Sequence, residues 1–471
     1  MRARTAVVAL LGIAVLIAAG CGGGAGGGGG GGGGKEGSGS SVTFWTAEDN
    51  PERVKATRAI LDRFQQQTNI KVALVAIGED QLISRVNSAS AAGSLPDVLA
   101  ALSLGVVHSL AADGITDPNA ASRVIDALDR ETFSKRALSL VESDGKPVAI
   151  PSDSWTQLLI YRKDLFAKAG LAAPTTFQAI RTAAARLTGD GMVGIVAGTK
   201  PGDSFTQQTF EYLALANNCQ LTDQNGAITL TSQPCVNTFR LYAELIRTAS
   251  IKGAQDADTT RAAYLAGKAA MAIWSSFILD ELAGLGNDAL PTCPQCRGDK
   301  SFLSRNSGIV TAIKGPDGTQ PSQFGELTSF AITKNAAKGA AKLVEFMMDD
   351  GYVDWLALAP EGKFPVRTGT KDQPTTFTDA WNHLETGRDR REPISEIYPP
   401  EVLTVLTTST DTMNRWGFPQ GQEVLVAAQL GELPITKALA AALDGTLDPA
   451  AAAEQAQADM SRIARPVRGG S

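Results

Sequence analysis

The chain has 471 residues, a formal net charge of -6, and 20% charged residues. This length exceeds what one hydrophobic core normally holds and is comfortable for two lobes. The balance is acidic and no basic stripe occurs, so the composition argues against a nucleic-acid-binding protein.

The N-terminus has the pattern of a secretory signal peptide. Two early arginines precede an apolar stretch over residues 7–19, which is too short for a stable membrane span. We predict that residues 1–20 are the signal peptide. The ending Ala-Ala-Gly-Cys resembles a bacterial lipobox, and that resemblance implies that Cys21 is lipidated. Ordinary signal cleavage, which would release a free secreted protein, is the alternative.

Residues 21–40 are rich in glycine. Glycine buries no apolar area and has the largest backbone entropy to lose, so this stretch is predicted to be a disordered linker. A glycine-rich coil of this length has a root-mean-square reach of roughly 25 Å. Such a linker would hold a folded body clear of a lipid surface.

Strands and helices alternate after the linker. Residues 42–45 predict a strand, the segment after Pro51 a helix, residues 70–77 a strand, and residues 98–102 another strand. This order is typical of βαβ units with a mostly parallel sheet. Ligands bind at the carboxyl ends of such strands, which directs attention to the segments directly after the first and third strands.

The later chain gives a coarser prediction. Residues 146–166 read as extended and residues 174–188 as a helix. A turn is expected at Asn225-Gly226; a calcium loop there would need more acidic residues than Asp223 supplies. After about residue 375 the chain is predicted to be mainly helical.

Four cysteines remain beyond Cys21, an even number for an exported chain. Two disulfides are expected, Cys219–Cys235 and Cys293–Cys296. The second pair, in Cys-Pro-Gln-Cys, could instead be a redox motif or half a zinc site. Zinc would need two more ligands, and His108 and His383 are the only histidines. We expect no metal and no cofactor.

Several blocks together resemble the extracellular solute-binding proteins of ABC importers, in the carbohydrate-binding family 1, similar to maltose- and glycerol-3-phosphate-binding proteins. The blocks occur in family order and span nearly all of residues 41–465: "IPSDSWTQLLIYRKDLFAKAGLAAPTTFQAIRTAAARLT", "AYLAGKAAMAIWSSF", "ELTSFAITKNAAKGAAKLVEFMMDDGYVDWL", "FPVRTG" and "ALDGTLDPAAAAEQAQADMSRI". Arg162 replaces the usual asparagine of the first block and Phe177 the usual tryptophan.

The resemblance implies an α/β fold of the two-lobe periplasmic-binding-protein type II, with mixed sheets flanked by helices and a hinge of three crossing segments. Matching the blocks puts the crossings near residues 150–155, 304–313 and 364–367. Lobe one would then comprise 41–151 and 310–363, and lobe two 152–309 and 364–471.

The resemblance also implies the function. We expect a membrane-tethered substrate-binding lipoprotein that captures an extracellular carbohydrate by lobe closure and delivers it to an ABC permease. The protein would be a monomer, anchored by Cys21 to the outer face of the cell membrane. The alternative solute is a glycerophosphodiester, which would require convergent cations; near the crossings only Arg305 and Arg367 offer themselves.

Sugar sites combine aromatic rings, which cover the C–H faces, with polar side chains that satisfy the hydroxyls. Matching the blocks gives these candidate ligand-binding residues: Glu48, Asp49, Asn50, Ser103, Asp153, Trp155, Trp274, Ser276, Phe277, Glu326, Arg367 and Trp416.

Each of these candidates has a structural alternative. Asp49 or Asn50 would serve equally as a helix cap. The alternative to ligand binding is a structural role in the hinge for three residues on the predicted crossings, Asp153, Trp155 and Arg367. Of Trp274 and Phe277, we expect one to stack on a sugar. The segment from Ala101 to Leu104 is poor in polar groups, which favours a smaller or less hydroxylated solute than a maltodextrin.

Rival functions find little support. No Gly-x-Ser-x-Gly elbow occurs. A glycosidase needs two opposed carboxylates, which only Glu48 with Asp153 would supply. A surface adhesin would show repeats or an extended β-rich chain, and neither is visible. We therefore expect a binding protein and not an enzyme.

Overall fold

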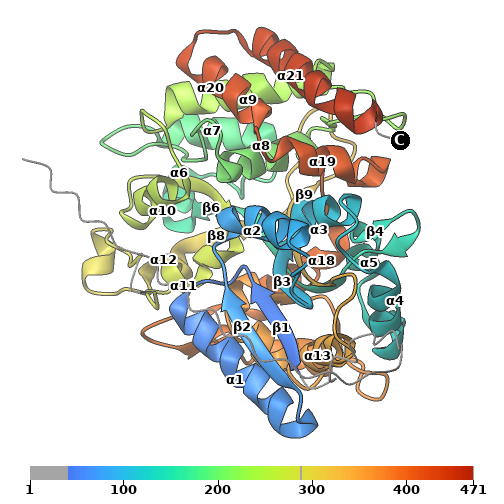
Figure 1. Ribbon diagram of the computed structural model, residues 1–471. Helices are drawn as coiled ribbons and strands as arrows, with labels where there is room; N and C mark the ends of the chain where they lie inside the picture. The colour runs from blue at the N-terminus through green and yellow to red at the C-terminus, as the bar shows by residue number, and fades with distance from the viewer. Residues whose placement is uncertain (1–40, 287–288, 470–471) are drawn as a thin grey trace, which may run out of the picture. The chain divides into compact units, whose positions relative to one another are not determined.

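The computed structural model describes residues 41–286 and 289–469, which belong to one compact unit (Figure 1). The predicted signal peptide, Cys21 and the glycine-rich linker lie outside the described residues.

The first strands follow the predicted βαβ order. Strand β1 (Ser41–Thr46) leads into α1 (Pro51–Thr68), β2 (Lys71–Ala76), α2 (Glu79–Ala91) and β3 (Val98–Ser103). Strand β1 pairs in parallel with both β2 and β3. The carboxyl ends of β1 and β3 therefore meet at one edge of the sheet, as the sequence predicts.

Two long strands extend this sheet toward the second half of the chain. The order is β10-β6-β9-β3-β1-β2, in which β6 spans Ile150–Arg162, β9 Gln323–Ile332 and β10 Phe364–Pro365. Strands β7 (Met271–Ser275) and β8 (Ser307–Val310) pair with the far half of β6, and β13 (Met413–Asn414) pairs with β9. Strand β9 runs antiparallel to both β3 and β6. The result is a mixed sheet.

These pairings refine the predicted crossings. Residues 150–155 begin β6 and residues 364–365 form β10, both at the expected positions. For the second crossing the sequence predicts residues 304–313, but β8 pairs only with β6. The strand that joins β6 to β3 is β9, which begins at Gln323. The boundaries of the two lobes remain a prediction.

Helices flank both ends of the sheet, and those after residue 375 dominate the C-terminal part as predicted (Figure 1). The other α-helices are α3 (Leu104–Ala112), α4 (Pro118–Ala127), α5 (Lys135–Leu140), α6 (Lys163–Ala169), α7 (Phe177–Leu187), α8 (Ser204–Ala216), α9 (Gln233–Ala249), α10 (Ala257–Leu265), α11 (Leu279–Leu282), α12 (Phe302–Asn306), α13 (Gly339–Met347), α14 (Tyr352–Leu356), α15 (Thr376–Trp381), α16 (Ile394–Ile397), α17 (Pro400–Thr407), α18 (Ser409–Thr412), α19 (Glu423–Gln429), α20 (Pro434–Asp444) and α21 (Pro449–Gly469).

Short elements complete the chain. They are the strands β4 (Glu142–Ser143), β5 (Lys146–Pro147), β11 (Glu385–Thr386) and β12 (Glu392–Pro393), and the 3-10 turns η1 (Arg130–Thr132), η2 (Ser276–Ile278), η3 (Gln295–Arg297), η4 (Pro360–Gly362) and η5 (Phe418–Gln420). The expected turn at Asn225-Gly226 is present, because Asp223 accepts the backbone N–H of Asn225 at 2.8 Å and that of Ala227 at 2.9 Å.

Both expected disulfides form, Cys219–Cys235 beside α9 and Cys293–Cys296 in a loop before α12. All four cysteines are fully buried. In the described part of the chain, no group of three or more histidine, cysteine or acidic side chains is arranged to hold a metal ion.

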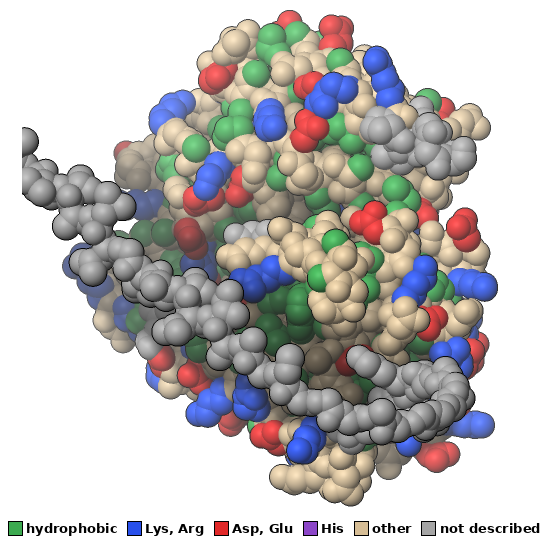
Figure 2. Space-filling view, viewed as in Figure 1, with side chains coloured by type: hydrophobic (Ala, Val, Ile, Leu, Met, Phe, Trp, Pro, Cys, Tyr) green, Lys and Arg blue, Asp and Glu red, His purple; other side chains and the backbone are tan. Residues whose placement is uncertain are grey.

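Within the described ranges, no single helix has the length and apolar character needed to cross a membrane; α19 and α20 meet that test only as a pair joined across a 57° bend. Charged side chains of both signs are scattered over the face seen in Figure 2.

Candidate functional site

A cavity of about 780 Å³ lies beside α1 and forms the candidate site. We call it the α1–α11 cavity. It is lined by α1, by the segment from the end of β7 through α11, by the residues around η4 and by the region of β11. Its residues are Asn50, Glu52, Arg53, Lys55, Ala56, Ala59, Ile60, Arg63, Arg261, Trp274, Phe277, Asp280, Glu281, Gly286, Asp354, Ala357, Leu358, Ala359, Pro360, Glu361, Glu385, Gly387, Arg388 and Arg391.

The start of α1 orients one wall of this cavity. The side chain of Asn50 accepts the backbone N–H groups of Glu52 and Arg53 at 3.1 and 3.4 Å, and Pro51 takes the first helical position. Asn50 is thus the cap, as one alternative predicted. The helix then turns Arg53 and Ile60, seven residues apart, onto the face that lines the cavity.

Aromatic side chains form a second wall. Phe277 lies in η2, half-buried, where the strand β7 ends. The ring of Trp155 meets it edge-on at 6.3 Å between centroids, and the Arg53 guanidinium lies 5.4 Å from the Phe277 ring. Trp274 also lines the cavity, but it is 8% exposed and its indole N–H donates to the carbonyl of Ala257 at 2.9 Å. Phe277 is therefore the more available stacking surface.

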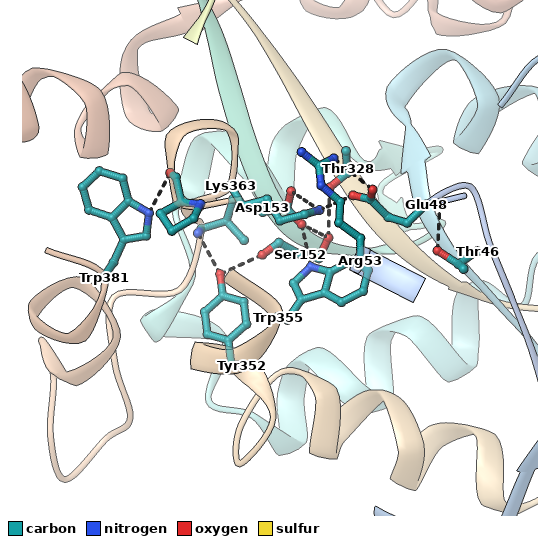
Figure 3. A network of polar contacts seen from close by, with 12 residues as sticks. Thr46, Glu48, Arg53, Ser152, Asp153, Thr328, Tyr352, Trp355, Lys363 and Trp381 are labelled. Carbon is teal, nitrogen blue, oxygen red and sulfur yellow. Dashed lines mark hydrogen bonds and ion pairs between the residues drawn. The ribbon is translucent and has the colours of Figure 1, made fainter. Parts of the chain in front are cut away.

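Behind the aromatic wall, a buried ion network holds the end of β1 against β6 (Figure 3). Lys363 lies 2.9 Å from Glu48 Oε1 and 3.4 Å from Asp153 Oδ1, and Arg53 pairs with Glu48 Oε2 at 3.1 Å. Trp355 donates its indole N–H to Asp153 Oδ2 at 2.8 Å. Burial alone would raise the pKa of Glu48, but the charges of Lys363 and Arg53 outweigh it and hold the pKa at about 2.

Three buried carboxylates form the floor of the cavity. Asp280, Glu281 and Glu361 are 6%, 9% and 5% exposed. Arg261 pairs with Glu281 Oε1 at 2.6 Å, whereas Glu281 Oε2 is buried without a hydrogen-bond partner. The hydroxyl of Thr386 donates to Glu361 Oε2 at 2.6 Å.

Burial and mutual repulsion change the acidity of this floor. Burial, followed by the charges of Glu361 and Glu281, raises the pKa of Asp280 to about 8. Burial also raises the pKa of Glu281 to about 7, although Arg261 opposes the shift, and it raises the pKa of Glu361. At about pH 7 the carboxyl group of Asp280 therefore keeps its proton, so the floor can both donate and accept hydrogen bonds.

The family model described as Bacterial extracellular solute-binding protein matches residues 47–354. This chain belongs to that family.

The solute-binding protein resembles a curated relative and many solved structures. It is 27% identical over 336 residues to YcjN of Escherichia coli (strain K12), which is named as an ABC transporter periplasmic-binding protein; the match covers 69% of this chain and 73% of YcjN.

Among solved structures, the GacH receptor of Streptomyces glaucescens matches with a TM-score of 0.68 and 18% identity, over 90% of this chain and 98% of the receptor. Maltose-bound MalE3 of T. maritima matches with a TM-score of 0.66 and 16% identity, over 90% of this chain and 99% of MalE3. A laminaribiose-bound sugar transporter of Arthrobacter chlorophenolicus A6 matches with a TM-score of 0.66 and 18% identity, over 90% of this chain and 99% of the transporter. These likenesses confirm the two-lobe type II fold.

The cavity of this solute-binding protein brings together three of the predicted ligand residues, Asn50, Trp274 and Phe277. Trp155 reaches it indirectly, through its contact with Phe277. Glu48 and Asp153 lie behind it in the ion network. Asp49 is exposed, Ser103 is half-buried at the end of β3, and neither lines the cavity.

The remaining predicted residues occupy structural positions away from the cavity. Trp416 is fully buried and donates its indole N–H to the carbonyl of Cys219 at 2.7 Å. Arg367 is 2% exposed and donates to the carbonyl of Leu128 at 2.9 Å. Glu326 pairs with Arg415 and accepts the N–H of Leu104 at 3.2 Å. The hydroxyl of Ser276 is buried without a partner.

Sequence reasoning missed the floor of the cavity. A local signal existed for two of its residues, because Asp280 and Glu281 follow Phe277 by three and four positions, one helical turn away. Glu361 had no such signal. It lies 81 positions from Asp280 in the chain and reaches the cavity only through the turn η4.

Proposed function

We propose that this protein captures an extracellular carbohydrate in the α1–α11 cavity and delivers it to an ABC permease. The supporting observation is the half-buried ring of Phe277 beside buried carboxylates. This pairs a surface for the C–H face of a sugar with acceptors for its hydroxyls. The solved structures of similar proteins with acarbose, maltose and laminaribiose support the same solute class. No catalytic step and no cofactor are proposed.

Capture would operate by closure of two lobes about the crossings in β6, β9 and β10. We keep the lobes near residues 41–151 and 310–363, and 152–309 and 364–471, with the second junction moved toward β9. A solute closes such a protein only by binding the closed form more tightly than the open form. Contacts from α1 on one side and η2–α11 on the other would supply that difference.

The alternative solute is a glycerophosphodiester. The cations expected for it do not converge, because Arg305 pairs with Asp299 and Arg367 serves backbone carbonyls. Lys55, Arg63, Arg388 and Arg391 also line the cavity, and these cations favour an anionic group.

A thermal-shift panel tests the solute class. Purified residues 41–471 are mixed with mono- and oligosaccharides and, separately, with glycerophosphodiesters and short peptides. We expect at least one carbohydrate to raise the melting temperature, because a ligand that binds only the folded state stabilises it. A shift with phosphodiesters or peptides and none with any carbohydrate would contradict the proposal and leave the fold intact.

We also propose that lipidated Cys21 anchors the protein to the outer face of the cell membrane. The test compares the full chain with the variant Cys21→Ala in a bacterial host. The wild type is expected in the membrane fraction and the variant in the soluble extracytoplasmic fraction. Equal membrane association of both proteins would rule out this anchor.

A further inference from the structure

The floor of the cavity places three buried acidic side chains close together, and their burial raises the pKa of each. Among the described residues, Asp280 and Glu361 have no salt bridge. Of the cations that line the cavity, Arg53 pairs with Glu48 at 3.1 Å, and Arg261 pairs with Glu281 at 2.6 Å and with Asp258 at 2.7 Å. Lys55, Arg63, Arg388 and Arg391 also line it, and Arg388 and Arg391 lower the pKa values of Glu281 and Glu361 against the effect of burial. Burying a carboxylate without a partner is costly, so such a group is expected where a ligand supplies the missing partner.

A second observation points to the same occupant. Glu281 Oε2 is buried and has no hydrogen-bond donor, although its other oxygen is paired. Asp280 accepts the backbone N–H of its neighbour Glu281. The cavity thus gathers Asp280, Glu281 and Glu361, to which Thr386 and Arg261 donate hydrogen bonds among the described residues.

The chemistry of the occupant follows from charge and donor number. A sugar hydroxyl donates one hydrogen bond and brings no charge, whereas an ammonium group donates three and is positive. A divalent metal ion would meet the charge, but no metal-binding group exists in the part of the chain that the structure describes. The adjacent Phe277 ring suits a sugar face and also favours a nearby cation.

We propose that the solute is a carbohydrate with a protonated amino group, which the carboxylates of Asp280, Glu281 and Glu361 recognise while Phe277 covers the ring. This inference rests on the proposed carbohydrate-binding function. Burial and the charges of Glu361 and Glu281 raise the pKa of Asp280 to about 8 although Arg53 opposes the shift, so an ammonium group that binds there displaces the proton of this carboxyl group.

Calorimetric titration with matched pairs tests the inference at about pH 7. The pairs are glucosamine and glucose, galactosamine and galactose, and the chitosan disaccharide and cellobiose. N,N′-diacetylchitobiose keeps the nitrogen and removes the charge. At least one amino sugar is expected to bind ten-fold more tightly or better than its neutral partner, and acetylation is expected to abolish the gain.

Variants identify the residue responsible. Asp280→Asn keeps the shape and removes the charge that the carboxyl group carries beside a bound ammonium, so it should lower the affinity for the amino sugar at least ten-fold more than the affinity for the neutral partner. Asp62→Asn is the matched control, because Asp62 is exposed on α1 and does not line the cavity. It should change neither affinity.

The outcomes separate the two claims. Neutral sugars that bind as tightly as every amino sugar would overturn this inference and leave the carbohydrate-binding function standing. Equal losses for both members of a pair in Asp280→Asn would also overturn it. Binding of phosphodiesters or peptides with no carbohydrate bound would overturn both.

Discussion

At the scale of single residues, Phe277 is the side chain on which solute binding most depends. Its half-buried ring lines the cavity, with the Arg53 guanidinium 5.4 Å from the ring centroid. We predict that Phe277→Ala lowers the affinity for the bound sugar by about ten-fold, since an aromatic contact of this kind contributes about 1.4 kcal/mol. Calorimetry measures the loss. Phe277→Tyr should keep the affinity within a few-fold, and an unchanged affinity in Phe277→Ala would remove this ring from the site.

Asp280 makes folding stability depend on pH in the opposite direction to most carboxylates. Its pKa of about 8 in the folded protein exceeds the ordinary value of 3.8, so the folded state keeps a proton that the unfolded chain has lost. Stability therefore falls as the pH rises through this range. Asp280→Asn removes that loss and should be more stable than the wild type at about pH 8, by ~1 kcal/mol or more, with the difference shrinking toward about pH 4.

Urea unfolding at both pH values measures this difference, with Asp62→Asn as the control. A stability difference between Asp280→Asn and the wild type that does not change with pH would contradict the raised pKa of Asp280. If the prediction holds together with the amino-sugar result, Asp280 is a residue kept for binding at the expense of stability, a common conflict at functional sites.

At the scale of elements, Lys363 joins three segments distant in sequence. It follows η4, and it pairs with Glu48 after β1 and with Asp153 in β6. Lys363→Met would leave the buried Asp153 without its cation and would leave Arg53 as the cation beside Glu48. We predict a loss of ~3 kcal/mol in the free energy of unfolding, of which Asp153→Asn in the double variant should restore part.

Urea unfolding measures the loss, and the exposed Lys338→Met is the control, expected to change stability by less than ~0.5 kcal/mol. A near-zero effect at Lys363 would show that the network does not hold these elements together.

The two disulfides should differ in their effect on stability. Cys219–Cys235 closes a separation of 16 residues, and Cys293–Cys296 one of 3. Because a longer loop restricts the unfolded chain more, replacing the first pair by serine should cost ~3 kcal/mol and replacing the second ~1 kcal/mol less. Unfolding of the two double-serine variants measures both. A larger loss for the short loop would contradict the entropic explanation.

At the scale of the whole molecule, local patterns predicted the elements better than their contacts. The strands β1 to β3, the helix α1 after Pro51 and the helical C-terminal part follow from periodicity and capping residues. Phe277 and Trp274 followed from a block resemblance. The place of the second crossing stays a prediction, because β8 and β9 are both plausible strands in sequence and only their pairing partners distinguish them.

Long-range contacts also decide which residues form the candidate site, and local sequence patterns do not reveal them. Glu48 lies at the expected strand end, but its carboxylate is occupied by Lys363, which is 315 positions away. Trp416 and Arg367 carry the right chemistry for a cleft but are buried by partners that no local pattern reveals. The acidic floor depends on Glu361 meeting Asp280, which is a long-range contact. Residue type alone therefore could not separate solute contacts from structural ones.

The mass of the molecule that co-purifies with the native protein tests the central claim most directly. The protein is isolated without denaturation from its own cells and analysed by native mass spectrometry, beside the variant Phe277→Ala as a control. We predict a bound carbohydrate that is diminished in the variant. A bound peptide or phosphodiester, or the same occupancy in both proteins, would contradict a sugar site in the α1–α11 cavity.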